Sequence, residues 1–223
     1  MFVIAAFDDA IAYASITKYD EVFAKYIRSC ALKFWKGSSR YFAPYVVLFQ
    51  SSMTGKSRLL KEIAQKKFFT VMICVRKPSL VVQPPRTKAV ADALFQGNIT
   101  SSTSTMLVLL KSYLLQFQQW VDKSVKEESQ ITPKDWHNQQ QEVDTEVGSA
   151  LINASRTSNF NMDLPDWSVV LRKLGQHPAR ASLDLLFVFD EARELLTKVD
   201  ENGIDLFRYL FVCMYVDSIC MYT

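Results

Sequence analysis

Apolar side chains recur along this chain at two different spacings. Helical spacing marks five segments, at residues 18–36, 56–66, 88–97, 105–126 and 137–153. Short runs rich in β-branched and aromatic residues favour buried strands at 45–49, 68–75 and 183–189. Because these strands alternate with helices, the pattern predicts an α/β fold with a parallel sheet.

Most of the helical pattern lies between the second and third strands. Thr87 is placed to cap the helix that ends near Gly97, and the charged stretch 127–135 is typical of a linker. The following segment, 137–153, is polar apart from a narrow apolar seam. A helix with so little apolar surface is expected to be peripheral.

The first strand leads directly into the segment with the clearest chemical signature. Its residues are Gln50, Ser51, Ser52, Met53, Thr54, Gly55, Lys56 and Ser57. The segment resembles the Walker A motif of the P-loop NTPases, G-x-x-x-x-G-K-[ST]. Gln50 replaces the first glycine of that motif, and this departure puts the geometry at the start of the loop in question.

The spacing of these residue types suits a phosphate group. A loop between a strand and a helix presents backbone N–H groups, and the helix N-terminus adds the positive end of its dipole. Gly55 allows close approach of the backbone, Lys56 would reach the β- and γ-phosphates, and Ser57 would ligate Mg²⁺. The motif therefore predicts binding of ATP with Mg²⁺ at 50–57.

An acidic pair follows the third strand. Asp190 and Glu191 come directly after the apolar run Leu185–Phe189, and this arrangement resembles the Walker B motif. Such acids belong at the carboxyl ends of the strands in an open α/β sheet. Asp190 would hold Mg²⁺ through water, so Ser57 and Asp190 form the predicted metal site. Glu191 would polarise the attacking water and is the predicted catalytic residue.

Together the two motifs resemble the additional-strand, catalytic-glutamate division of the P-loop NTPases. The stretches 40–96 and 164–212 also look like uncharacterised fungal and oomycete P-loop proteins, some of which are grouped with Crinkler-type effectors. The resemblance implies a three-layer core with a parallel sheet at 44–223, a helical insertion at about 88–175 and an N-terminal helical segment at 1–43. It also implies an NTPase module tied to host interaction or genome conflict.

The sequence departs from a whole NTPase after the acidic pair. Enzymes of this division need at least two more strands, one of which ends in a polar sensor, whereas 207–223 has room for part of one element. We therefore expect an incomplete core. Five arginines are candidates for an arginine finger, and each is expected to be a surface charge: Arg76, Arg86, Arg156, Arg172 and Arg180.

One further motif is expected to be a coincidence. Thr197-Lys198-Val199-Asp200 fits the guanine-reading pattern [NT]-K-x-D of GTPases, but it lies only a few residues after Asp190 and continues a helical pattern. We interpret it as the charged face of a helix. ATP is therefore preferred over GTP.

Composition limits the classes of binding partner and the cellular compartment that we expect for this protein. The net charge of +3 gives no support for a nucleic-acid partner. The four cysteines form no C-x-x-C pair and the chain has two histidines, which argues against a zinc site. No apolar run is long enough to span a bilayer, and the N-terminus is a poor signal peptide. An intracellular protein, cytoplasmic or nuclear, without a membrane partner is expected.

The combined expectation is an ATP-binding P-loop protein, built as a Mg-dependent ATPase that is weak in isolation. One alternative is a nucleotide-dependent protein-interaction module, in which the helical insertion binds a protein partner and hydrolysis is slow or absent. Another is a P-loop kinase, although neither an acceptor site nor a lid is visible in the sequence.

Overall fold

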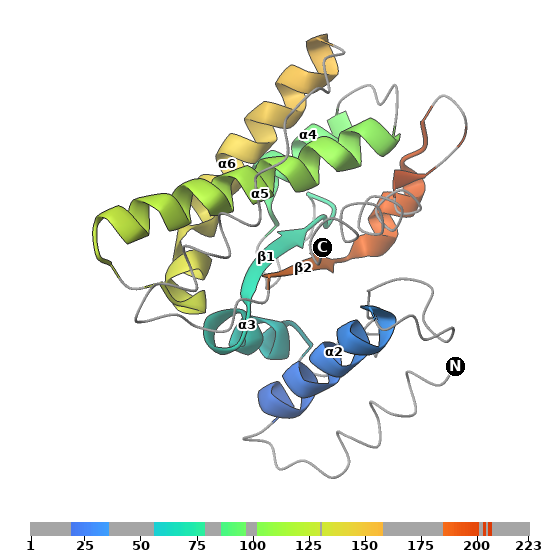
Figure 1. Ribbon diagram of the computed structural model, residues 1–223. Helices are drawn as coiled ribbons and strands as arrows, with labels where there is room; N and C mark the ends of the chain where they lie inside the picture. Colours follow the sequence, from blue (N-terminus) through green and yellow to red (C-terminus); the bar gives the residue numbers. More distant parts are fainter. Residues whose placement is uncertain are drawn as a thin grey trace.

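The computed structural model describes residues 19–35, 56–78, 86–96, 102–129, 131–157, 185–200, 203 and 205–206. Its elements in chain order are α2 (Tyr19–Trp35), α3 (Lys56–Lys66), β1 (Phe69–Cys74), α4 (Lys88–Gln96), α5 (Ser102–Lys126), α6 (Pro133–Thr157), β2 (Leu185–Asp190) and the 3₁₀ helix η2 (Ala192–Thr197) (Figure 1). These bounds confirm the expected helices and the second and third expected strands. The expected strand at 45–49 lies outside the described residues. No helix in the described ranges is long and apolar enough to cross a membrane.

The two strands form a parallel pair, as the sequence predicts. Their register runs from Phe69 opposite Leu185 to Cys74 opposite Asp190. The chain between them carries α4, α5 and α6, so a long helical excursion separates two neighbouring strands. The described part of the protein is thus a mixed, mostly helical fold around a two-stranded parallel sheet.

One face of the sheet carries an aromatic core. Residues alternate along a strand, so Phe69, Val71 and Ile73 share this face and are fully buried. The Phe69 ring lies 5.3 Å from the Phe117 ring of α5, and Phe187 of β2 lies 6.3 Å from Tyr113 of the same helix. Helix α5 therefore covers this face, above the sheet in Figure 1.

The opposite face is covered by α3 and α2. Phe23 and Ala24 of α2 form a second buried cluster with Ile63 of α3 and with Phe68, and Leu186 of β2 packs against it. Only Lys67 and Phe68 lie between the end of α3 and the start of β1. The sheet therefore has helices on both of its faces, which is the layering expected of an α/β fold.

Helix α6 is central, and the expectation of a peripheral helix is wrong. It begins at Pro133, four residues earlier than expected, and Trp136 in its first turn is fully buried. The Trp136 indole Nε1 donates to the carbonyl of Thr70 at 3.1 Å, and the Gln140 amide donates to the carbonyl of Met72 at 2.8 Å. Side chains of α6 thus donate hydrogen bonds to backbone carbonyls on the edge of β1 that faces away from β2. Without them these carbonyls would remain unpaired.

Thr87 serves the same strand edge. The sequence suggests that its side chain caps α4, but the Thr87 hydroxyl accepts the N–H of Cys74 at 2.9 Å. Its own N–H donates to the Cys74 carbonyl at 3.0 Å, while its carbonyl accepts the N–H of Ala91 in the first turn of α4. Thr87 therefore ties the end of β1 to the start of α4.

Helices α4 and α6 cross at a glycine. A Cβ atom on Gly148 would lie 2.7 Å from the carbonyl carbon and 2.8 Å from the Cβ of Ala89. Such a contact is shorter than packed atoms tolerate, and part of it is backbone, which cannot turn aside. Glycine is therefore required where these two helices meet.

Candidate functional site

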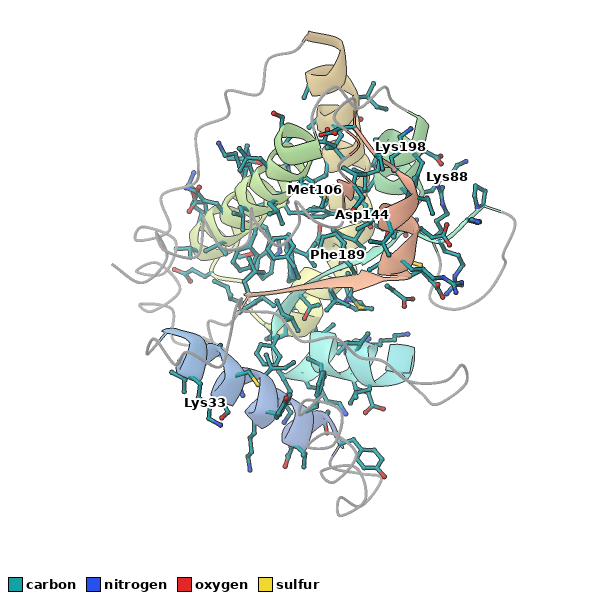
Figure 2. The ribbon with its side chains drawn as sticks, turned by 90° about the vertical axis from the view of Figure 1, so that its right-hand side faces the viewer. Lys33, Lys88, Met106, Asp144, Phe189 and Lys198 are labelled. Atoms are coloured by element: carbon teal, nitrogen blue, oxygen red, sulfur yellow. The ribbon has the colours of Figure 1, made fainter. Side chains whose placement is uncertain are left out.

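One predicted site residue, Asp190, lies at the carboxyl end of the sheet, toward which α3 also begins. Asp190 is the last residue of β2 and lies opposite Cys74 on the face that α3 covers. Because α3 turns into β1 within two residues, it runs back along the sheet against the strand direction. Its first turn, which begins at Lys56, therefore lies toward the same end of the sheet as Asp190. Figure 2 shows this helix running below β2.

The carboxylate of Asp190 is largely buried and incompletely satisfied. Its Oδ2 atom is buried and accepts no hydrogen bond from the described residues. The guanidinium Nη2 of Arg76 lies 3.7 Å from this oxygen, an ion-pair distance too long for a hydrogen bond. Burial raises the pKa of Asp190, and the neighbouring charge of Glu191 adds to the increase, while Arg76 and a hydrogen bond with Cys74 oppose it.

An orphaned buried carboxylate oxygen is chemically suited to a cation. Carboxylate oxygens are the ligands that Mg²⁺ prefers, and Mg²⁺ usually keeps several waters and takes few protein ligands. The described residues contain no group of three or more His, Cys, Asp or Glu side chains that could hold a metal by themselves. A single carboxylate that works together with a phosphate ligand fits this donor set better than a metal cage built by protein alone.

Arg76 also lies at this site, although the sequence placed it only among five candidate arginine fingers. It was expected to be a surface charge, but its side chain is only 7% exposed. It follows β1 by two residues, where the Val75 N–H donates to the Asp190 carbonyl and extends the strand pairing. The expectation is wrong because burial at this position depends on the pairing of β1 with a strand far along the chain. The signal that could have found it is an arginine directly after a buried strand.

Arg86 is also less exposed than expected, and its guanidinium is used elsewhere. Its Nε donates to the carbonyl of Arg76 and its Nη1 to the carboxylate of Asp92 in α4, both at 2.6 Å. The expectation of a surface charge is therefore wrong for Arg86 as well. The side chain of Arg156, together with Arg172 and Arg180, lies outside the described residues.

Glu191 has an unusual backbone conformation at the junction of β2 and η2. Its φ and ψ are 58° and 33°, in the left-handed region that non-glycine residues seldom adopt. Such positions cost of the order of 1–3 kcal/mol and are concentrated at functional sites. The Glu191 carboxylate lies 3.2 Å from Nε of Arg193, so an ion pair holds the predicted catalytic group.

The phosphate-binding residues of the first motif are described only in part. Lys56 and Ser57 are the first two residues of α3, as the motif requires, and their side chains lie outside the described residues. Gln50, Ser51, Ser52, Met53, Thr54 and Gly55 lie outside them entirely. Within the described chain, the structure thus brings together Asp190, Glu191 and Arg76, and the start of α3 lies toward the same end of the sheet.

The guanine-reading motif is not a helix face, contrary to the sequence interpretation. η2 ends at Thr197, and Val199 forms an antiparallel bridge with Asp205. The Lys198 ammonium donates to the carbonyl of Phe95 near the end of α4 at 3.1 Å, and Asp200 is buried. The motif thus lies beside an antiparallel bridge and is tied to α4. Lys198 makes a contact that stabilises the fold, and Asp200 is buried within it.

A second polar group lies inside the helical layer and was not found from the sequence. The Tyr113 hydroxyl of α5 donates to the Asp144 carboxylate of α6 at 2.6 Å. Burial raises the pKa of Asp144 to about 7, although hydrogen bonds from Tyr113 and Gln140 partly oppose the increase. Asp144 is labelled in the interior in Figure 2. Its position next to Val143, in the apolar seam of α6, is the signal that could have revealed it.

Comparison with known proteins identifies a family for this chain. No curated protein and no solved structure matches this chain. A family described as a domain of unknown function, DUF8735, matches residues 16–217, which include both strands and all the described helices. This chain therefore belongs to the DUF8735 family.

Proposed function

We propose that this protein binds ATP with Mg²⁺ at the carboxyl end of the sheet, between the first turn of α3 and Asp190. The observation that carries the proposal is the orphaned buried oxygen of Asp190 at the end of the sheet where α3 begins. The residues that open α3, Lys56 and Ser57, follow Gly55 in the spacing of a phosphate-binding loop.

Each residue has a defined task in this proposal. The N–H groups of the segment 50–55 and the N-terminus of α3 bind the phosphates, and Lys56 adds a positive charge beside the β- and γ-phosphates. Ser57 and Asp190 would hold Mg²⁺, the latter through water, and the metal would supply positive charge that neutralises the phosphates. Glu191 accepts a hydrogen bond from water near the γ-phosphate and orients it.

A second candidate function is a nucleotide-dependent interaction module with little or no hydrolysis. The observation that favours it is the ion pair between Glu191 and Arg193, whose atoms lie 3.2 Å apart. A carboxylate paired with a guanidinium is a weaker hydrogen-bond acceptor for water, so this pair reduces the ability of Glu191 to orient a nucleophile. We therefore expect turnover to be much slower than binding.

The test is a titration of the purified chain with ATP in the presence of Mg²⁺. Lys56→Ala removes a charge-assisted contact, and the affinity should fall by about ten- to a hundredfold, equivalent to about 1.5–3 kcal/mol. Lys66→Ala is the matched control, because Lys66 is an exposed lysine in the last turn of the same helix and should leave affinity unchanged. Equal affinities of wild type and Lys56→Ala, with both folded, would rule out a phosphate site at the start of α3.

A further inference from the structure

We propose that Arg76 is the resident counter-ion of Asp190, and that its guanidinium balances the charge of the carboxylate until Mg²⁺ takes over this role. The inference rests on the proposed function for the identity of the cation. It goes beyond that function because neither motif of the sequence includes Arg76. It states that loading the site is an exchange of one cation for another.

The geometry supports an exchange because Arg76 is held close to Asp190 without binding it tightly. Nη2 of Arg76 lies 3.7 Å from Oδ2 of Asp190, beyond hydrogen-bond distance, and Oδ2 accepts no hydrogen bond from the described residues. A buried carboxylate without a nearby cation is costly, so some positive charge has to stand beside it. Arg76 supplies that charge and leaves the lone pairs of the oxygen available.

The backbone on both sides keeps the two groups in place. The N–H of Val75 donates to the carbonyl of Asp190 at 3.1 Å, which fixes the end of β1 against the end of β2. The carbonyl of Arg76 accepts Nε of Arg86 at 2.6 Å, and Arg86 is bound in turn to Asp92 of α4. The Arg76 backbone is thus anchored on two sides, and the guanidinium is kept within reach of Asp190.

The positive charge of Arg76 determines whether its removal strengthens or weakens cation binding. Mg²⁺ near Asp190 would lie within several ångströms of the Arg76 guanidinium, and the two positive groups repel each other. Removing the guanidinium should therefore strengthen cation binding. Even at the dielectric of bulk water, one positive charge about 6 Å from a divalent ion corresponds to about a tenfold change in affinity.

The experiment compares Arg76→Gln, Arg76→Lys and Lys123→Gln in two titrations. The first follows binding of Mn²⁺ alone to the nucleotide-free chain by electron paramagnetic resonance. The second measures the Mg²⁺ concentration that gives half-maximal ATP binding. Arg76→Gln should lower both midpoints about tenfold, while Arg76→Lys keeps the charge and should stay close to wild type. Lys123→Gln removes an exposed positive charge in the last turn of α5, and it should leave both midpoints unchanged.

The outcomes are distinguishable from failure of the proposed function. Loss of ATP binding by the wild type, with the Mn²⁺ midpoint still lowered in Arg76→Gln, would contradict the nucleotide site and leave the exchange intact. Unchanged or raised midpoints in folded Arg76→Gln would overturn the exchange. The exchange would also be overturned if neither the wild type nor Arg76→Gln bound Mn²⁺. If Arg76→Gln does not fold, Arg76→Met keeps the aliphatic part of the side chain packed and provides the same comparison.

Discussion

Asp144 makes the stability of this protein depend on pH in a direction opposite to that of most acids. Its carboxylate is buried between α5 and α6, where the hydroxyl of Tyr113 donates to it at 2.6 Å. Burial raises its pKa from 3.8 to about 7. In the unfolded chain the carboxyl group is hydrated and loses its proton near its ordinary pKa, whereas in the folded protein it keeps the proton until near neutral pH.

The sign and size of the effect follow from this difference. Between pH 3.8 and about pH 7 the folded state binds more protons at Asp144 than the unfolded state does, so the free energy of unfolding falls as pH rises through that window and levels off above it. Each pH unit corresponds to about 1.4 kcal/mol for one group, and the window spans about three units, so the contribution is about 4 kcal/mol at most.

Asp144→Asn removes the ionisation and keeps an oxygen that can accept the Tyr113 hydroxyl. Urea unfolding followed by tryptophan fluorescence, at intervals from about pH 5 to about pH 8, should show that the variant loses the decline seen in the wild type. At the upper end the variant should be more stable by about 1–3 kcal/mol, because the new amide hydrogens offset part of the gain. Glu146→Gln, an exposed acid of the same helix, is the control and should keep the decline. The same pH dependence in Asp144→Asn and wild type would refute the argument.

Three more predictions concern packing and the candidate site. Gly148→Ala should lower the free energy of unfolding by about 1–3 kcal/mol in urea, because its methyl group meets the backbone of Ala89 and outweighs the better helix propensity of alanine; unchanged stability would mean that the two helices separate without cost. Gln50→Gly should tighten ATP binding in a calorimetric titration or leave it unaltered, and a large loss would show that the Gln50 side chain makes a contact of its own. Asp190→Asn should weaken Mg-dependent ATP binding, whereas Glu191→Gln should spare binding and abolish the slow release of phosphate; wild-type turnover of several per second would contradict the expected weak activity.

Local pattern was enough to predict most of the described elements. The helices at 19–35, 56–66 and 102–126 and the two strands follow from apolar spacing, because each buries its own apolar residues. The same pattern underestimated the burial of α6, because that burial depends on two polar side chains. Trp136 and Gln140 bind backbone carbonyls of β1 that lie 66 and 68 residues earlier, and no local spacing encodes such a contact.

The candidate site was predictable to a similar extent. Short motifs identified Asp190 and Glu191, since an acid pair after an apolar run is a local feature. The burial of Arg76 and the Tyr113–Asp144 pair were missed because each depends on partners on a distant element. The left-handed backbone of Glu191 was also not foreseeable, because a glutamate without a following glycine gives no signal for a positive φ.

The central claim is that phosphate and metal meet between the start of α3 and Asp190. The most direct measurement is a crystal structure of the chain with a non-hydrolysable ATP analogue and Mn²⁺, in which anomalous scattering locates the metal. The account predicts one metal peak near the Asp190 carboxylate, bridged to it by water, with phosphate oxygens between the metal and the N–H groups that open α3. A bound analogue or metal at any other part of the chain, with this end of the sheet unchanged, would contradict the account.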